Sequence, residues 1–228
     1  MKEKLEKYNL ILASKSPRRQ FLLKELGLPF EIRTTDTDES FPKNLKGKQI
    51  ALYLCKKKAD AFRNKLKPND LLITADTIVW INNKVLNKPA NYKEAVNMLK
   101  ILSGKMHIVY TAVCISSPLP EERGTRGETR SFVVSTKVFF KKLTDKEIDF
   151  YIRSYKPYDK AGAYGAQECL PAGMNPCSEA EIRFLKKLKK IKMIKNSMNT
   201  KAGIGYAGIK KIIGSYFNVM GLPMKELY

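Results

Sequence analysis

The chain of 228 residues is 43% hydrophobic and carries a formal net charge of +21 at pH 7. This composition excludes a largely disordered protein and predicts a globular chain with a sizeable core. No apolar run approaches the roughly 20 residues that span a bilayer, and the charged first residues lack the apolar stretch of a signal peptide. We therefore expect a cytoplasmic protein without a membrane segment.

The basic charge is concentrated in one segment. Ten basic residues and no acidic ones lie between Arg183 and Lys211, which is about half of the net charge. A run of like charge is usually a solvated surface, so we do not expect specific nucleic-acid binding. The four cysteines have no C-x-x-C spacing, which favours reduced thiols over disulfides or a zinc site.

The first motif is an apolar run followed by a polar turn and a helix start. Residues 10–13 predict a short strand, and the apolar spacing over residues 17–26 predicts a helix with Ser16 at its N-cap. Arg18 and Arg19 then fall in the first turn, where free backbone N–H groups carry partial positive charge. The pair is either part of a phosphate-binding turn or two solvated surface residues.

Two features after this helix involve charged side chains. A predicted strand at 30–34 runs into residues 35–39, whose three carboxylates form either a polar loop or a site for a cation or a catalytic base. In a predicted helix at 47–65, a rotation of about 100° per residue places Lys58 inside the apolar stripe. Such a lysine either extends its amine to the protein surface or points it into a cleft toward an anion.

Asp76 is the sharpest anomaly in the sequence, because it interrupts the apolar run 70–81, which predicts a buried strand. An ionised carboxylate there is costly unless it is paired or binds a metal, so a purely structural role requires a lysine or arginine partner. Asn82 and Asn83 then predict a tight hairpin turn into a returning strand at 84–86.

The later elements are marked by caps and by β-rich runs. Capping boxes at Asn91 and Thr144 predict two helices, and the runs 106–116 and 131–140 predict two strands. His107 has no nucleophile beside it, so we expect a structural histidine at a strand end.

Two segments near the C-terminal end carry weaker signals. The glycine-containing loop 157–167 has the composition of a segment that lines a site. Residues 179–194 are compatible with a basic helix.

A series of motifs along nearly the whole chain resembles the Maf family of nucleoside triphosphate pyrophosphatases. The motifs are Leu12–Arg19, Asp38–Glu39, Lys58–Ala59, Ala75–Thr77, Asn87–Pro89, Leu102–His107, Asp159–Gln167 and Gly214–Pro223. The resemblance implies an α/β fold with a long mixed twisted sheet, flanking helices and two lobes around a cleft, as in inosine triphosphatases. It also implies a cytoplasmic homodimer that hydrolyses nucleoside triphosphates to the monophosphate and pyrophosphate, in a family linked to restraint of cell division.

The resemblance also implies roles for individual residues. Asp76 matches the catalytic proton acceptor, Glu39 and Lys58 match the active cleft, and Asp76 with Glu39 would hold the divalent cation, Mg²⁺ or Mn²⁺. The phosphate-contacting positions match Ser14, Arg18 and Lys88, and the positions that set base preference match Arg19, Thr77 and Gln167. This last set resembles the subgroup acting on dTTP and UTP.

Two alternatives stay open beside that interpretation. One is a Maf-like enzyme acting on modified purine nucleotides such as 7-methyl-GTP, and the other is a non-catalytic nucleotide- or nucleic-acid-binding regulator of cell division.

One segment departs from the family pattern. We expect a single domain over residues 1–228 with a basic insertion at 169–205, because the family motifs resume at Lys211. Its one-sided charge suggests no internal pairing that holds it against the core, so we expect a mobile surface excursion that is dispensable for chemistry.

Overall fold

In the computed structural model, which describes residues 5–118, 128–171, 173–197 and 208–228, seven strands form one mixed sheet. The strands are β1 (Asn9–Leu12), β2 (Glu31–Ile32), β3 (Asp70–Ile81), β4 (Lys84–Leu86), β5 (Met106–Ser116), β6 (Thr129–Phe140) and β7 (Ile209–Ile213). Their order is β2-β1-β3-β5-β6-β7, with β4 paired to β3. β1 is parallel to β2 and to β3, and the other pairs are antiparallel.

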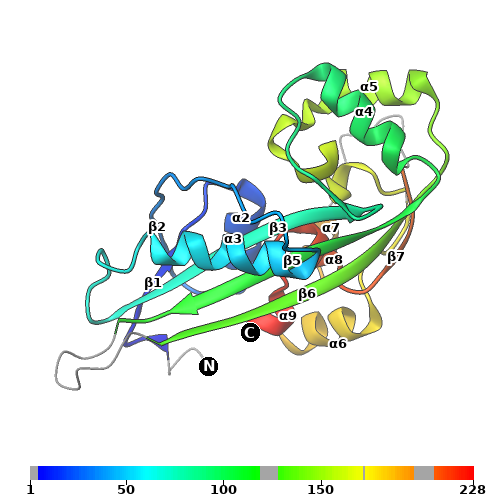
Figure 1. Cartoon of the computed structure of the whole chain (residues 1–228). Helices are drawn as coiled ribbons and strands as arrows, with labels where there is room; N and C mark the ends of the chain where they lie inside the picture. The colour runs from blue at the N-terminus through cyan, green and yellow to red at the C-terminus, as the bar shows by residue number, and fades with distance from the viewer. Residues whose placement is uncertain (1–4, 119–127, 172, 198–207) are drawn as a thin grey trace.

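Helices cover both faces and one end of this sheet (Figure 1). They are α2 (Pro17–Glu25), α3 (Lys48–Asp60), α4 (Tyr92–Leu102), α5 (Asp145–Tyr155), α6 (Glu179–Lys187), α7 (Met193–Ser197), α8 (Tyr216–Met220) and α9 (Met224–Leu227). Figure 1 shows α3 lying along the long strands β3, β5 and β6, with α4 and α5 at one end of these strands. The mixed sheet, flanking helices and two lobes agree with the predicted fold class. Within the described ranges, no helix is long and apolar enough to cross a bilayer.

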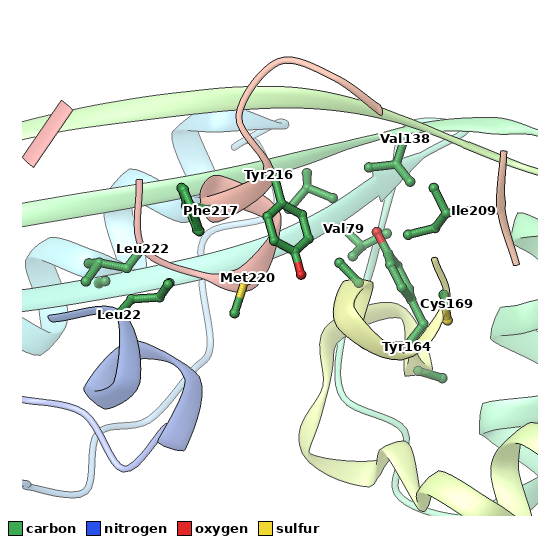
Figure 2. Close-up of a cluster of buried hydrophobic side chains, with 14 of the residues drawn as sticks. Leu22, Val79, Val138, Tyr164, Cys169, Ile209, Tyr216, Phe217, Met220 and Leu222 are labelled. Atoms are coloured by element: carbon green, nitrogen blue, oxygen red, sulfur yellow. The ribbon is translucent and has the colours of Figure 1, made fainter. Parts of the chain in front are cut away.

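Alternation along β3 divides the core into two clusters, because successive side chains of a strand point to opposite faces. Leu72 and Ile78 pack with Leu54 of α3 on one face. Ile73 and Val79 pack with α2, α4, α5 and α8 on the other, where Figure 2 shows side chains from several of these elements in one buried cluster.

Several predictions of local structure are confirmed. β3 has the predicted bounds, and Asn82 and Asn83 have φ values of 51° and 57°, as the tight turn requires. Thr144 and Glu147 form the predicted capping box. Burial lowers the pKa of His107 to about 3, and its Nε2 lies 2.8 Å from the Tyr164 hydroxyl, so this histidine is neutral and structural.

Some boundaries and caps differ from prediction. β2 has only two residues, because it pairs only with the last two residues of the four-residue β1. α3 ends at Asp60, where the chain tightens into turns. At α4, the Glu94 carboxylate accepts from the Ala90 N–H, so Asn91 caps the helix without a reciprocal box.

The prediction that residues 169–205 lie outside the core is wrong for the part that the structure describes, which excludes 172 and 198–205. Cys169, Leu185 and Met193 are buried in the main cluster. Glu181 is 1% exposed and hydrogen-bonds both to Ser178 and to residues of α8. The predicted basic helix is also interrupted, because Lys189 takes a left-handed φ of 57° after α6.

All four cysteines are free and buried, as the sequence predicted for reduced thiols. Cys55 and Cys114 lie in the α3 cluster, and Cys169 and Cys177 lie in the opposite one.

Burial of Leu185 predicts that α6 contributes to stability. Leu185→Ala should lower the free energy of unfolding by about 2–5 kcal/mol, because it leaves a cavity in a filled core. The exposed neighbour Lys186 provides the control, since Lys186→Ala should stay close to wild type. Urea denaturation of both variants measures this. Equal free energies of unfolding for the two variants would show that α6 does not pack into the core.

Candidate active site

The candidate site lies at an interruption in the edge of β3. β1 pairs with β3 only as far as Ile73, and β4 joins the same edge only from Val79. The stretch between them, which contains Asp76 and Thr77, has no strand neighbour on that edge within the described residues. A cleft of about 440 Å³ opens beside this gap, and ligands of open α/β sheets bind where strands end and diverge in this way.

Asp76 points to the face of β3 that α3 covers, and its partner is Lys58. The Lys58 amine donates to Asp76 Oδ1 at 2.5 Å and to Glu39 Oε1 at 3.0 Å. Burial raises the pKa of the Asp76 carboxyl, and the positive charges of Lys58 and Arg19 partly oppose that rise. Of the two alternatives for Lys58, an amine at the protein surface or an amine pointed inward toward an anion, the structure shows the second.

The pairing of Glu39 gives it the opposite character. Burial acts to raise the pKa of the Glu39 carboxyl, but Lys58 and Lys88 outweigh it, and the net pKa is lowered. Lys88 Nζ lies 3.5 Å from the same Glu39 oxygen. Glu39 is thus held as a carboxylate between two amines, whereas burial shifts Asp76 toward its neutral form.

The carboxylate cluster at 35–39 does not form a metal cage. Asp36 pairs with Lys15 and Asp38 with Lys57, each at 2.9 Å, which leaves Glu39 as the member that reaches the Lys58 amine. No group of three or more potential ligands occurs among the described residues. Asp76 and Glu39, which share the Lys58 amine, remain as the candidate ligands, and one or two carboxylates are enough for a hydrated divalent cation that also binds substrate phosphates.

The start of α2 forms another wall of the cleft. Arg18 donates to Asp159 at 3.0 Å, and Asp159 also accepts from Lys160 at 2.9 Å. Ser14 accepts from the Ser16 N–H at 3.2 Å, while Ser16 occupies the predicted N-cap position without a side-chain cap bond. The arginine is therefore an ordered cation on the cleft wall.

Arg19 and Thr77 meet on the opposite face of β3. Arg19 donates to Thr77 Oγ1 at 2.9 Å, to the Gly221 carbonyl at 2.8 Å and to Ser14 Oγ at 3.4 Å. Gln167 lines the same cleft, and its Oε1 is a buried atom with no hydrogen-bond partner within the described part of the chain. A buried acceptor without a donor is costly, so this oxygen is free to accept an N–H group inside the cleft.

Comparison with known proteins shows which family this chain belongs to. Residues 9–174 match the family model described as Maf-like protein. The chain belongs to this family. It is 44% identical to a dTTP/UTP pyrophosphatase of Phocaeicola vulgatus, over 100% of this chain and 97% of that protein. Proteins with the same name from Bacteroides thetaiotaomicron and Flavobacterium johnsoniae are 42% and 41% identical, over 98% and 100% of this chain and 95% and 96% of theirs. The single-domain organisation and the insertion at 169–205 stay predictions.

The structure of this Maf-like chain brings the predicted site residues together. The cleft is lined by Ser14, Arg18, Arg19, Glu39, Lys58, Thr77, Lys88 and Gln167. Asp76 lies behind this lining and contacts Lys58. Sequence reasoning missed Asp159, Lys160 and Gly221, although the first two lie in the loop whose composition suggested a site.

The Lys58–Asp76 contact predicts an electrostatic response that requires no substrate. Lys58→Met should raise the pKa of Asp76 further, because an opposite charge at close range favours the ionised carboxylate. NMR titration of the labelled Asp carboxyl carbons measures this. Lys88→Met is the matched control, since Lys88 contacts Glu39 and should leave the pKa of Asp76 unchanged. An unshifted Asp76 in the Lys58 variant would contradict the pairing.

Proposed function

We propose that this protein hydrolyses dTTP and UTP to the nucleoside monophosphate and pyrophosphate. The observation that carries the proposal is the Lys58 amine between a buried and a half-exposed carboxylate, inside a cleft that also presents Arg18 and Lys88. Cations that bind a polyphosphate and a base that activates water are what attack at phosphorus requires. The names of the relatives at 41–44% identity support the same reaction.

Asp76 is the proposed base. A water oxygen bonds to the α phosphorus, and Asp76 accepts the water proton. The bond from the α phosphorus to the oxygen that bridges to the β phosphate breaks, and pyrophosphate leaves with the bonding electron pair. A carboxylate whose pKa is raised by burial is a better proton acceptor than an exposed one. Lys58 keeps Asp76 ionised and oriented before the substrate arrives.

The remaining charged groups bind and orient the phosphates. Arg18, Lys88 and Ser14 are the proposed phosphate contacts, and Arg18 exchanges its bond with Asp159 for phosphate oxygens. Asp76 and Glu39 would hold a divalent cation, Mg²⁺ or Mn²⁺, which supplies charge neutralisation at the phosphates. The proposal includes a homodimer in the cytoplasm, as the family resemblance implies.

Arg19, Thr77 and Gln167 are the proposed determinants of base preference. Thymine and uracil share an N3–H donor flanked by carbonyl acceptors, and the Gln167 amide can accept from the first and donate to the second. The unpartnered Gln167 Oε1 supports this role. Activity on 7-methyl-GTP is the runner-up, and a nucleotide-binding regulator without turnover is the competing class.

The first test separates an enzyme from a binding protein. Pyrophosphate release should occur with dTTP and UTP in the presence of Mg²⁺ or Mn²⁺. Asp76→Asn should reduce kcat by at least about 100-fold while nucleotide binding persists, because it removes the base and keeps the shape. Asp60→Asn, an exposed change two residues beyond Lys58, is the control and should retain activity. If the wild-type protein releases no pyrophosphate from any nucleotide, the enzymatic function is wrong and the nucleotide-binding regulator remains.

The second test concerns the base. Wild type should prefer dTTP and UTP to dATP, ATP and 7-methyl-GTP, as judged by kcat/KM. Gln167→Leu should lower the dTTP preference over dATP by at least about tenfold, because loss of a buried pairing to the base removes discrimination. Comparable efficiency with purine nucleotides in wild type would overturn the assignment to dTTP and UTP.

A further inference from the structure

The Glu181 carboxylate joins the starts of two helices that lie far apart in the sequence. Glu181 is 1% exposed, and its Oε2 accepts from the N–H and the hydroxyl of Ser178, both at 3.0 Å, at the start of its own helix α6. The same carboxylate accepts from Ser215 Oγ at 2.7 Å and from the N–H groups of Tyr216 and Phe217 at 3.1 Å. A buried carboxylate needs such donors, and here most of them belong to the start of α8.

The other end of α8 contacts the proposed base-recognition residues. The helix has only five residues and ends at Gly221, whose φ is 110°. The Gly221 carbonyl accepts from Arg19 Nε at 2.8 Å. A Cβ at this position would lie 3.4 Å from both Arg19 Nε and Thr77 Oγ1, so the end of α8 fits closely against this pair. A displacement of α8 therefore moves a wall of the cleft and a partner of Arg19.

A second set of hydrogen bonds connects the middle of α8 to the same pair. The Asn218 carbonyl accepts from Thr111 Oγ1 at 2.8 Å. Thr111 Oγ1 lies 3.0 Å from Thr77 Oγ1, which in turn accepts from Arg19 at 2.9 Å. Asn218 and Thr111 are fully buried. Because a buried polar network loses much of its stabilisation when one member is missing, a shift at the start of α8 is transmitted to Arg19.

We propose that Glu181 is a positioning residue for base recognition. Glu181 holds the start of α8, α8 holds Gly221 and Asn218, and these fix the geometry of Arg19 and Thr77. The carboxylate touches neither the substrate nor the reacting atoms. This inference rests on the proposed function, because it assigns Glu181 a part in the preference for dTTP. It also gives the segment 169–205, which the sequence suggested to be a surface excursion, a part in base recognition.

The test compares substrates within one preparation. Glu181→Gln keeps the shape of the side chain but removes its negative charge. It also places an NH₂ group, which cannot accept a hydrogen bond, against the N–H and hydroxyl donors that the carboxylate accepts from in the wild type. The ratio of kcat/KM for dTTP to that for dATP should fall about tenfold, since a site held out of register loses its discrimination. The change should come from a higher KM for dTTP, with kcat within about twofold of wild type, because Asp76 and Lys58 lie on the opposite face of β3.

Glu179→Gln is the matched control. It removes the same charge from the same helix, but Glu179 is exposed and its partner is Arg183. Its dTTP/dATP ratio should equal that of wild type. A loss of correctly folded protein lowers both kcat/KM values equally, so a purely structural cap leaves the ratio unchanged in Glu181→Gln and would overturn the inference. A wild type without a preference for dTTP would instead overturn the proposed function, and the inference with it.

Thr111→Val keeps the inference testable if Glu181→Gln does not fold. It removes one hydroxyl at nearly constant volume and leaves α6 untouched. The dTTP/dATP ratio should fall in this variant too, and an unchanged ratio would overturn the connection from α8 to Thr77. Where both variants fold, the combined change should reduce the ratio by less than the product of the single effects, because both act on one network.

Discussion

An ionisable carboxylate in the middle of a buried strand is the constraint on which the site depends. Asp76 is 6% exposed and lies in a strand whose other residues are mostly apolar. Burial without a partner would keep it protonated, so the fold supplies the Lys58 amine from α3. The gap between β1 and β4 leaves room for a cleft beside this part of the strand while the strand stays inside the sheet. The strand β3 thus sets the position of the proposed base, α3 supplies its charged partner, and the gap between β1 and β4 leaves room for the cleft.

The alternation of β3 separates two tasks that are adjacent in sequence. Asp76 points toward α3 and its lysine, whereas Thr77 points toward α2, α8 and Arg19. The proposed proton acceptor with its lysine and the pair proposed to read the nucleobase are therefore supported by different packing clusters on opposite faces of one strand. A change in one cluster can alter its own task with limited effect on the other.

The parts of the structure that were predictable depend on local patterns. The bounds of β3, the Asn82–Asn83 turn and the inward direction of Lys58 follow from apolar periodicity and from turn preferences. Motif resemblance supplied the full set of nine predicted site residues; eight of them line one cleft, and Asp76 lies behind it in contact with Lys58.

What was missed depends on contacts between distant segments. Glu181 sits in a segment whose charge suggested a solvated surface, yet its partners on α8 lie more than thirty residues away. The spacing from Ser178 to Glu181 predicts a helix cap, but it carries no information about a second helix that shares the carboxylate. The same holds for Gly221, whose contact with Arg19 spans nearly the whole chain.

The distribution of thiols has a practical consequence. The four buried cysteines divide evenly between the two faces of the sheet. A thiol reagent reaches a buried sulfur only when the packing around it opens, so labelling rates report local unfolding on each face separately. The chain therefore carries two native cysteines on each face as probes. Their labelling rates distinguish local unfolding beneath α3 from local unfolding around α6 and α8 without an engineered cysteine.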